Sequence, residues 1–404
     1  MTASTHYDAI VVGLGAVGAA TLYQLARRGA RVLGIDRFAP PHDHGSSHGE
    51  SRITRLAIGE GDAYVPLVKR SHAIWRELEA RTGRSILTQT GGLVLAPRDG
   101  AADHHGKPDF VRRTIASAAR FGIAHEVLDA DAIRARFPQF HLQGNEIGYF
   151  EPEAGFVRPE QAIAAQLDAA RADGALVREG EAVVALEGGT HGVAVRLRTA
   201  HGTTLTADQV VVSAGAWLPE FLSQAARDAW QGEFEVYRQV MYWFDAGESA
   251  ADFAPGRLPI FIWMYGDGEE DYMYGFPSAD GQRPSLKVAT EQYARTTSPG
   301  DLAREVTDAE VQAMYRSRVE GRFPQIGGRA VDARACMYTV TRDRHFVVDS
   351  LPDAPQVLVA SACSGHGFKH SAGLGEAIAQ RVLGQASGID LSAFAHRKTS
   401  RETQ

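Results

Sequence analysis

The chain has 404 residues, of which 44% are hydrophobic and 23% charged, and its formal net charge is −7 at pH 7. This length can hold two domains around a large core, and the composition is that of an ordinary soluble globular protein. The negative balance excludes a general nucleic-acid binder, because phosphate contacts need clustered cationic charge. No apolar run approaches the ~18 residues of a membrane helix, so no membrane partner is expected.

Two further features bear on where the protein works. The first strand is predicted within the first ten residues, which leaves no room for a signal peptide. Two cysteines in the whole chain make a disulfide framework improbable and fit a reducing compartment. We therefore expect a cytoplasmic protein.

The first predicted unit is a strand, a tight turn, a helix and a second strand, over DAIVVGLGAVGAATLYQLARRGARVLGIDR from residue 8. Gly13, Gly15 and Gly18 have the G-x-G-x-x-G spacing that lets a backbone approach a pyrophosphate closely. Asp36 ends the second strand, where an acid hydrogen-bonds a ribose hydroxyl. The pattern predicts a dinucleotide-binding βαβ unit and does not by itself distinguish NAD from FAD.

The next elements alternate between the two predicted domains. A polar loop, PPHDHGSSHGESR, precedes a predicted helix at about 66–81, and residues 87–97 are interpreted as a pair of strands. An amphipathic helix is predicted at 108–122. The segment EPEAGFVRPEQAIAAQLDAARADGA contains a helix that we expect to return to the nucleotide domain.

The second half begins with two strands near 182–198 and the run DQVVVSAGAW at 208–217, which is typical of a parallel-sheet edge beside a cofactor. Residues 232–325 are rich in aromatic residues with alternating patterns, which predicts an antiparallel platform with one solvated face. Another strand pair (ARACMYTVT and HFVVD), a buried strand at 357–363, the loop SGHGFKH and a helix at about 371–383 complete the chain.

These elements predict an α/β (α+β) fold in which a Rossmann-like nucleotide domain is interleaved with a substrate domain built on an antiparallel sheet. Strand-plus-glycine signals recur far from the first βαβ unit, which favours FAD over NAD because an extended cofactor reaches distant loops. The predicted nucleotide domain comprises residues 1–85, 150–230 and 326–404, and the substrate domain comprises 86–149 and 231–325.

The loop SGHGFKH carries the clearest chemistry outside the first βαβ unit. Gly365 and Gly367 allow close backbone approach, and the N-terminus of the following helix stabilises negative charge, such as that of a reduced flavin. His366 is either a hydrogen-bond donor to that charge or a loop histidine with partners of its own.

Several blocks together resemble the monomeric sarcosine oxidase and N-methyltryptophan oxidase family of D-amino-acid-oxidase-like flavoproteins. They are the opening βαβ unit, PPHDHGSSHGESRITR, GEGDAYVPL, YGFP with LKV, RACMYTVTRDRHFVVD and SGHGFKHSAGLGE, and they span about residues 6–390. The resemblance implies an FAD-dependent amine oxidase acting on the C–N bond of a secondary (N-methyl or cyclic) amino acid. It implies O2 as oxidant, hydrogen peroxide as product and an imine that hydrolyses.

The resemblance also assigns roles to residues. It implies covalent attachment of FAD to Cys336 and no role for Cys363, and we expect the charges of Arg334 and Arg342 to favour the Cys336 thiolate. The predicted catalytic residues are Lys287, Arg52, His48 and Tyr274, and the predicted substrate-binding residues are Arg55, Lys369 and Tyr274. The predicted cofactor-binding residues are Gly13, Gly15, Gly18, Asp36, Arg37, Ser46, His48, Arg52, Val183, Cys336, Gly365, His366, Gly367 and Lys369, and no metal site is predicted.

Physical chemistry fits these roles. A carboxylate substrate needs a cation, and the guanidinium of Arg55 offers bidentate hydrogen bonding, with Lys369 as its second partner and Arg52 near the flavin. Lys287 matches the family's oxygen-activating lysine, because a buried ammonium stabilises the superoxide anion.

The chain departs from the family in ways that affect substrate choice. Glu291 stands where a histidine is common, Ser47 precedes His48 where a His-His pair is usual, and the strand with Trp263, Met264 and Tyr265 is expected near the pocket. These changes indicate a substrate other than sarcosine, with a larger or cationic side chain. Two alternatives stay open: a dehydrogenase of the same superfamily that passes electrons to a quinone or carrier, and a flavin-binding protein without turnover. A monomer or small homo-oligomer is expected.

Overall fold

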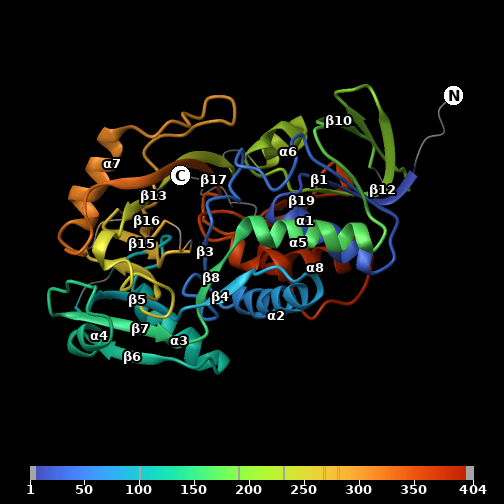
Figure 1. Cartoon of the computed structure of the whole chain (residues 1–404). Helices are drawn as coiled ribbons and strands as arrows, with labels where there is room; N and C mark the ends of the chain where they lie inside the picture. Colours follow the sequence, from blue (N-terminus) through green and yellow to red (C-terminus); the bar gives the residue numbers. More distant parts are fainter. Residues whose placement is uncertain are drawn as a thin grey trace, which may run out of the picture.

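The computed structural model describes residues 6–99, 102–189, 192–230, 233–266, 268, 270–279, 281 and 283–396. Two large sheets lie side by side, with a small third sheet between them, and a layer of helices packs under the first sheet (Figure 1). This mixed α/β architecture confirms the predicted fold class. Among the described residues, no helix combines the length and the apolar character that a bilayer crossing requires.

The first sheet is parallel at its centre, in the order β10-β11-β12-β1-β2-β9, with β19 also paired to β12 and β18 paired to β19. Its central strands are almost wholly buried and apolar, as expected for parallel strands covered on both faces. The strands are β1 (His6–Val12), β2 (Val32–Ile35), β9 (Leu176–Arg178), β10 (Val183–Glu187), β11 (Val195–Thr199), β12 (Thr204–Val212), β18 (Val347–Leu351) and β19 (Ala354–Ser361).

Four helices form the layer beside this sheet: α1 (Ala16–Arg27), α2 (Tyr64–Thr82), α5 (Pro159–Ala172) and α8 (Ser371–Val382). Helix α1 packs on β1 and β2, whereas α2 packs on α5 and α8. Helix α1 lies between α5 and α8. The α1–α8 contact is close because Gly375 has no side chain: a Cβ there would meet the Cβ of Ala20 at 2.5 Å. The C-terminal strand, loop and helix therefore complete the nucleotide-type fold that the N-terminus begins.

The second sheet has the order β17-β13-β16-β15-β14-β5-β7-β6 and is antiparallel except where β14 pairs with β5. Its strands are β5 (Gly92–Pro97), β6 (Glu126–Asp129), β7 (Glu146–Glu151), β13 (Glu235–Asp245), β14 (Ile260–Met264), β15 (Tyr272–Phe276), β16 (Ser285–Ala289) and β17 (Ala330–Val340). The small third sheet joins β3 (Arg52–Thr54), β8 (Gly155–Val157) and β4 (Leu87–Gln89).

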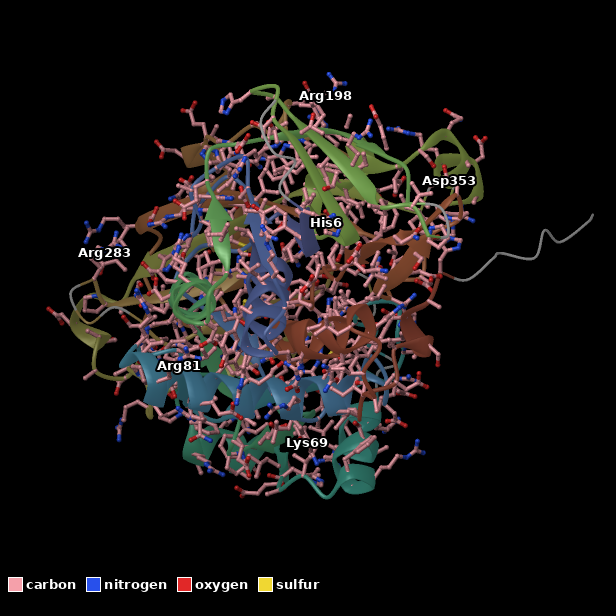
Figure 2. All side chains as sticks on the ribbon, turned by 90° about the vertical axis from the view of Figure 1, so that its right-hand side faces the viewer. His6, Lys69, Arg81, Arg198, Arg283 and Asp353 are labelled. Carbon is pink, nitrogen blue, oxygen red and sulfur yellow. The ribbon has the colours of Figure 1, made fainter. Side chains whose placement is uncertain are left out.

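Short helices surround the second sheet and the connections. They are α3 (Phe110–Phe121), α4 (Ala130–Arg136), α6 (Gln224–Ala229), α7 (Asp308–Met314), the π-helical turn η3 (Tyr315–Val319) and the 3-10 turns η1 (Gly215–Phe221), η2 (Gly247–Ser249), η4 (Phe368–His370) and η5 (Ser392–Phe394). Charged side chains lie outermost, as Lys69 and Arg81 on α2 show (Figure 2). Arg81 pairs with Asp173 at 2.7 Å and so joins α2 to the end of α5.

The predicted helices at 66–81, 108–122 and 371–383 are confirmed as α2, α3 and α8. The predicted strand pairings are wrong in two places. β4 pairs with β8, and β5 pairs with β14 and β7, so 87–97 is not a hairpin. β17 pairs with β13 while β18 pairs with β19. Strand β12 is not at an edge of its sheet either, because it pairs with β1 on one side and with β11 and β19 on the other.

The prediction of one solvated face on the second sheet is also wrong. Strands β14, β15 and β16 are buried at nearly every position. One face packs against aromatic residues beneath the short helices, and the other face turns toward the candidate site. The strands of the first sheet lie within the predicted nucleotide-domain segments, whereas β17 joins the second sheet from the segment 326–404. The domain division itself stays a prediction.

Candidate active site

A cavity runs along the carboxyl ends of the first sheet, from the turn after β1 to the glycine loop after β19. Among the residues that line it are Gly13, Gly15, Asp36, Arg37, Ser46, Arg52, Val183, Gly365 and Gly367. This is the place where open α/β sheets bind ligands. The sequence-predicted cofactor residues from four distant segments therefore meet in one cavity.

The turn after β1 requires glycine at two positions. Gly13 has φ 86°, and a Cβ there would lie 2.7 Å from the carbonyl oxygen of Ser213. Gly18 lies behind the turn instead of lining the cavity, and a Cβ there would lie 1.8 Å from the Gly13 oxygen. The Asp36 carboxylate accepts hydrogen bonds from the backbone N–H groups of Leu14 at 2.7 Å and Phe38 at 2.8 Å, so it also fixes the shape of the turn.

The far end of this cavity fits the reactive part of an extended cofactor. A Cβ at Gly367 would lie 1.7 Å from the Ala362 oxygen, and Gly365 has φ 81°, so the loop requires glycine at both positions and lines the cavity there with bare backbone. The hydroxyl of Thr339, which lines the cavity, is buried and has no hydrogen-bond partner. A buried polar group without a partner is costly, so a ligand that supplies one is expected there.

A second cavity adjoins the first and shares the wall residues Arg52, Tyr338, Gly365 and Phe368 with it. It lies between the second sheet, the segment after β3 and the glycine loop. Its lining also includes Arg55, Glu60, His105, Tyr274, Lys287, Glu291, His366 and Lys369. All the predicted catalytic and substrate-binding residues except His48 therefore gather at this cavity.

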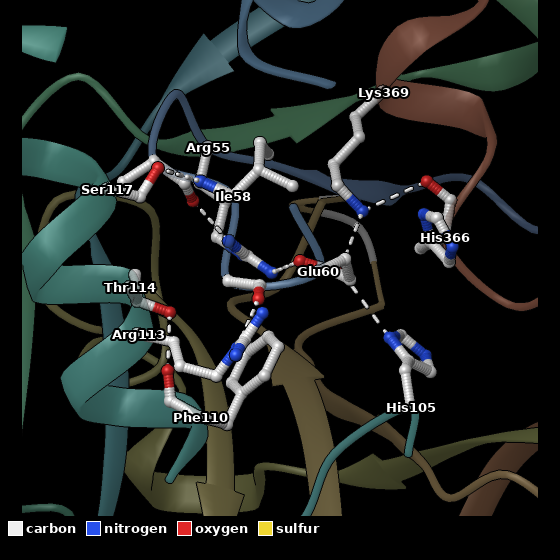
Figure 3. A network of polar contacts seen from close by, with 12 residues as sticks. Arg55, Ile58, Glu60, His105, Phe110, Arg113, Thr114, Ser117, His366 and Lys369 are labelled. Atoms are coloured by element: carbon white, nitrogen blue, oxygen red, sulfur yellow. Dashed lines mark hydrogen bonds and ion pairs between the residues drawn. The ribbon is translucent and has the colours of Figure 1, made fainter. Parts of the chain in front are cut away.

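Glu60 lies at the centre of the charged groups in the second cavity. Figure 3 shows Arg55, Lys369 and His105 directed at its carboxylate. Arg55 Nη2 lies 2.7 Å from Glu60 Oε2, and Lys369 Nζ lies 3.4 Å from Oε1. Although burial opposes ionisation, the charges of Arg55 and Lys369 hold the pKa of Glu60 well below its usual value. Burial lowers the pKa of Lys369 to about 8, and Glu60 opposes that shift.

Arg55 and Lys369 retain binding capacity beyond Glu60. The Nε of Arg55 is buried and has no hydrogen-bond partner. Lys369 donates one hydrogen bond to the His366 carbonyl oxygen at 2.9 Å, and its ammonium carries three donors. We call Arg55 and Lys369 together the carboxylate site, after the ligand group that the sequence predicts for them.

A second carboxylate, Glu291, continues the network away from Glu60. His105 Nε2 lies 2.8 Å from Glu291 Oε1, and the Tyr293 hydroxyl donates to Oε2 at 2.5 Å. Although burial opposes ionisation, the charge of His105 lowers the pKa of Glu291 to about 2. In turn Glu291, with Glu60, raises the pKa of His105 against the effect of burial.

Lys287 lies where β16 meets the segment before β3. Its ammonium donates to the carbonyl oxygens of Gly49 at 2.6 Å and Ser51 at 2.8 Å, and to the Ser51 hydroxyl at 3.1 Å. It also lies 4.5 Å from the centre of the Phe276 ring. Burial, together with the charge of Arg52, lowers the pKa of Lys287 well below its usual value. The three acceptors match the three donors of an ammonium, so the site holds a dehydrated ammonium beside a second cation.

Comparison with known proteins identifies the family. A sequence profile of the family described as FAD dependent oxidoreductase matches residues 8–381. The chain belongs to this family of FAD-dependent oxidoreductases. The glycines, Asp36 and Thr339 of the first cavity fit an extended dinucleotide such as the FAD of this family.

Close relatives narrow the group within the family. The chain is 40% identical to a monomeric sarcosine oxidase of Streptomyces avermitilis over 98% of both chains. It is 34% identical to an N-methyl-L-tryptophan oxidase of Yersinia pestis over 96% of this chain and 98% of the relative. The oxidoreductase is thus a member of the monomeric sarcosine oxidase and N-methyltryptophan oxidase family. Among solved structures, an amino acid oxidase essential for nikkomycin biosynthesis shares its fold, with a TM-score of 0.81, 22% identity and coverage of 99% and 100% of the two chains.

Besides Gly18, two predicted cofactor residues of the oxidoreductase line neither cavity: His48 and Cys336. His48 is 3% exposed, both its ring nitrogens lack hydrogen-bond partners, and burial with the nearby Arg52 lowers its pKa to about 3. Cys336 is 1% exposed on β17, while Cys363 lines the first cavity. Tyr338, two residues along the same strand face from Cys336, lines both cavities.

The expectation that arginines favour a Cys336 thiolate is wrong for this structure. Burial raises the pKa of the Cys336 thiol to about 11. Arg334 forms an ion pair with Asp332 at 2.7 Å, so its charge is largely compensated there. Burial therefore outweighs the neighbouring arginines of the sequence.

The strand expected to supply an aromatic wall presents a different residue to the site. On β14, Ile262 lines the second cavity, while Trp263 packs on the opposite face with Phe140 and Phe323. Neither Trp263, Met264 nor Tyr265 lines that cavity. Because strand side chains alternate between two faces, only every second residue of β14 can line the cavity. The sequence alone does not tell which of the two faces this is until the partner strands are known.

His366 combines both interpretations left open by its sequence. Its Nε2 donates to the carbonyl oxygen of Arg344 at 3.0 Å, whereas Nδ1 is buried without a partner. Burial and the charge of Lys369 lower its pKa well below the usual value, so the ring is neutral. Glu60 and His105 are the functional candidates that sequence reasoning missed. Glu60 lies within the block GEGDAYVPL that marked the family, whereas His105 has no such signal.

Proposed function

We propose that the protein is an FAD-dependent amine oxidase of an N-methyl or cyclic secondary amino acid. The substrate C–N bond loses two electrons and two protons and becomes an imine, which water hydrolyses. O2 takes up the two electrons and two protons and becomes hydrogen peroxide. The observation that carries the proposal is the meeting of the carboxylate site and Lys287 in a cavity that shares a wall with the cofactor cavity.

The carboxylate site would bind and orient the substrate. The unpartnered Nε of Arg55 and the remaining donor of Lys369 are suited to a carboxylate. Their positive field also disfavours an ammonium on the bound substrate, so the amine is held neutral, as oxidation of its C–H bond requires. FAD, when bound, supplies the acceptor for the two electrons. The relatives are named as oxidases of sarcosine and N-methyl-L-tryptophan, which supports a secondary amino acid as substrate.

Lys287 would serve the oxygen half of the reaction. Reduction of O2 places negative charge on oxygen, and a preorganised cation in a dry site stabilises that charge strongly. Lys287 is 2% exposed and is held by three acceptors, so its position is set before oxygen arrives. Arg52, whose guanidinium donates to the carbonyl oxygens of Ser46 and Ser51, adds a second cation at the shared wall.

Anaerobic mixing with sarcosine, N-methyl aromatic amino acids, proline and pipecolate tests the proposal. At least one of them is expected to bleach the flavin absorbance, and admission of O2 is expected to restore it with one peroxide per substrate. If no compound in the panel bleaches the flavin, the enzyme proposal fails. Bleaching that O2 does not reverse supports the dehydrogenase alternative.

Covalent attachment of FAD to Cys336 is part of the proposal. The thioether would replace an S–H and a C–H bond by a C–S bond, and O2 would be the oxidant that takes up the two electrons and two protons released. We place it at Cys336 on the strength of the block ACMYT and of the strand face that Cys336 shares with Tyr338. The denatured wild type and Cys363→Ser should show flavin fluorescence on a gel, and Cys336→Ser should not. Release of all flavin from the wild type by acid would contradict the assignment.

The proposal also covers the cellular compartment and the oligomeric state of the enzyme. Both cysteines are free thiols, which is compatible with a cytoplasmic, reducing environment. We propose a monomer or small homo-oligomer, which sedimentation of the holoenzyme would establish.

A further inference from the structure

His105 enters the second cavity from the connection between β5 and α3. It is 5% exposed, and its backbone has φ 55°, a region that non-glycine residues rarely occupy. Nothing in the family assignment gives this residue a role. Such a conformation persists where surrounding contacts hold it, and at a functional site it suggests a role in the mechanism.

Those contacts are two carboxylates. His105 Nδ1 lies 3.4 Å from Glu60 Oε1, and Nε2 lies 2.8 Å from Glu291 Oε1. His105 Nε2 is hydrogen-bonded to Glu291, whereas Nδ1 approaches Glu60 without a hydrogen bond. Because the ring lies between two buried carboxylates, its protonated form, the imidazolium, is favoured. The pKa of His105 is raised in the same sense, with Glu291 and Glu60 as the causes that oppose its burial.

The charges around Glu60 then leave a place for one anion. Arg55, Lys369 and His105 are three cations, and Glu60 and Glu291 are two carboxylates, all of them buried. A substrate carboxylate at the carboxylate site would bring this group of five to neutrality. Without the His105 charge, the same substrate would leave one buried negative charge uncompensated, which is costly.

Glu60 is the group through which His105 would act. The Glu60 carboxylate holds both members of the carboxylate site, so it competes with a substrate carboxylate for them. His105 offers Glu60 a third cation on the side away from Arg55. When a substrate takes Arg55 and Lys369, His105 remains as the partner of Glu60.

We propose that His105 is a positioning residue that makes the site selective for anionic substrates by neutralising Glu60 when the substrate carboxylate binds. This inference rests on the proposed function, since it assumes the carboxylate site. It adds a determinant of substrate class that lies outside the segments marking the family. His105 itself does not touch the reacting C–N bond in this proposal.

The test titrates the holoenzyme with methoxyacetate, a carboxylate without an oxidisable amine, and follows the flavin absorbance. Methoxyacetamide is the neutral counterpart. His105→Gln, which removes the charge and keeps a hydrogen-bonding side chain, should raise the Kd of methoxyacetate ~10-fold. The Kd of methoxyacetamide should change less than about twofold. His141→Gln, at an exposed histidine that lines neither cavity, is the matched control and should leave both constants unchanged.

A double-mutant cycle with Glu60→Gln decides whether Glu60 transmits the effect. In that background His105→Gln should alter the Kd of methoxyacetate by less than about twofold. An equal weakening in both backgrounds, or an equal loss of carboxylate and amide binding, would overturn the proposal and assign His105 a structural role.

His105→Lys provides a second, independent check, because it restores the positive charge. It should keep the preference for carboxylate over amide within about threefold of the wild type, and a loss as large as that of His105→Gln would contradict the proposal. A wild type that binds no methoxyacetate would instead disprove the carboxylate site, and with it the proposed function.

Discussion

The two ends of the joined cavities are built in different ways. At the βαβ end, Gly13, Gly18 and Asp36 lie within one short segment, and backbone hydrogen bonds fix the turn. At the substrate end, Arg55, His105, Glu291 and Lys369 come from four segments spread over the chain, and their charges hold one another. Binding of a common cofactor fragment thus depends on local sequence, whereas substrate recognition depends on tertiary structure. At the substrate end, substitution of a single charged residue should therefore weaken substrate binding by degrees and not abolish it.

The largest expected effect is on the oxygen reaction. Lys287→Met removes a preorganised buried cation, so reoxidation of the reduced enzyme by O2 should slow ~100–1000-fold. Reduction by substrate under anaerobic conditions should change far less, because Lys287 is bound to Gly49 and Ser51 and not to the carboxylate site. Stopped-flow absorbance resolves the two half-reactions, and equal slowing of both would assign Lys287 to substrate binding.

At the carboxylate site the expected effect is smaller. Arg55→Lys keeps the charge opposite Glu60 and loses the planar guanidinium, so the Kd of a carboxylate ligand should rise ~10–100-fold. Flavin content should stay at the wild-type level, because Arg55 lines the second cavity and not the first. Equilibrium titration measures the first quantity and the absorbance ratio of flavin to protein the second. Unchanged affinity would place substrate carboxylates elsewhere.

A substitution at the βαβ end should change the flavin content of the enzyme and leave its substrate site intact. A Cβ in Gly18→Ala would lie 1.8 Å from the Gly13 oxygen, which forces the turn to shift, so flavin content should fall ~10-fold. Gly327→Ala, at an exposed glycine whose Cβ would meet nothing within 4 Å, is the matched control. The ratio of flavin to protein absorbance, measured for both purified variants, tests this expectation. Full flavin content in Gly18→Ala would mean that the turn is more plastic than its geometry indicates.

The pH response should be the smallest effect. Burial lowers the pKa of Lys369 to about 8, so its ammonium is present below pH 8 and is lost above it. The Kd of methoxyacetate should therefore be flat below this value and rise above it, at most tenfold per pH unit. Glu60 faces Lys369 and does not titrate in this range, because its pKa is well below the usual value. His105, whose pKa is raised by Glu291 and Glu60, also loses its charge as the pH rises. Lys369→Met should therefore bind more weakly and show a smaller rise than the wild type.

The contrast between the two ends also explains what the sequence could predict. The βαβ unit, the helices and the candidate residues of both cavities were predictable because their signals are local patterns or family blocks. The strand pairings were not, because register depends on partners far along the chain, as β5 beside β14 illustrates. His105 and Glu291 are 186 positions apart, and no local pattern links them. The Cys336 thiol shows that adjacent charges in sequence do not reveal burial.

Gly365 has a consequence for how this enzyme can change. It lines both cavities, and a Cβ there would lie 2.2 Å from Glu291 Oε1 and 3.1 Å from His105 Nε2. A side chain at this position of the shared wall would therefore disturb both cavities at once. Substitutions that change the substrate range should therefore occur in the connection that carries His105 and at Ile262 on β14, because these positions line the second cavity and not the first. Laboratory evolution of this scaffold would be directed there first.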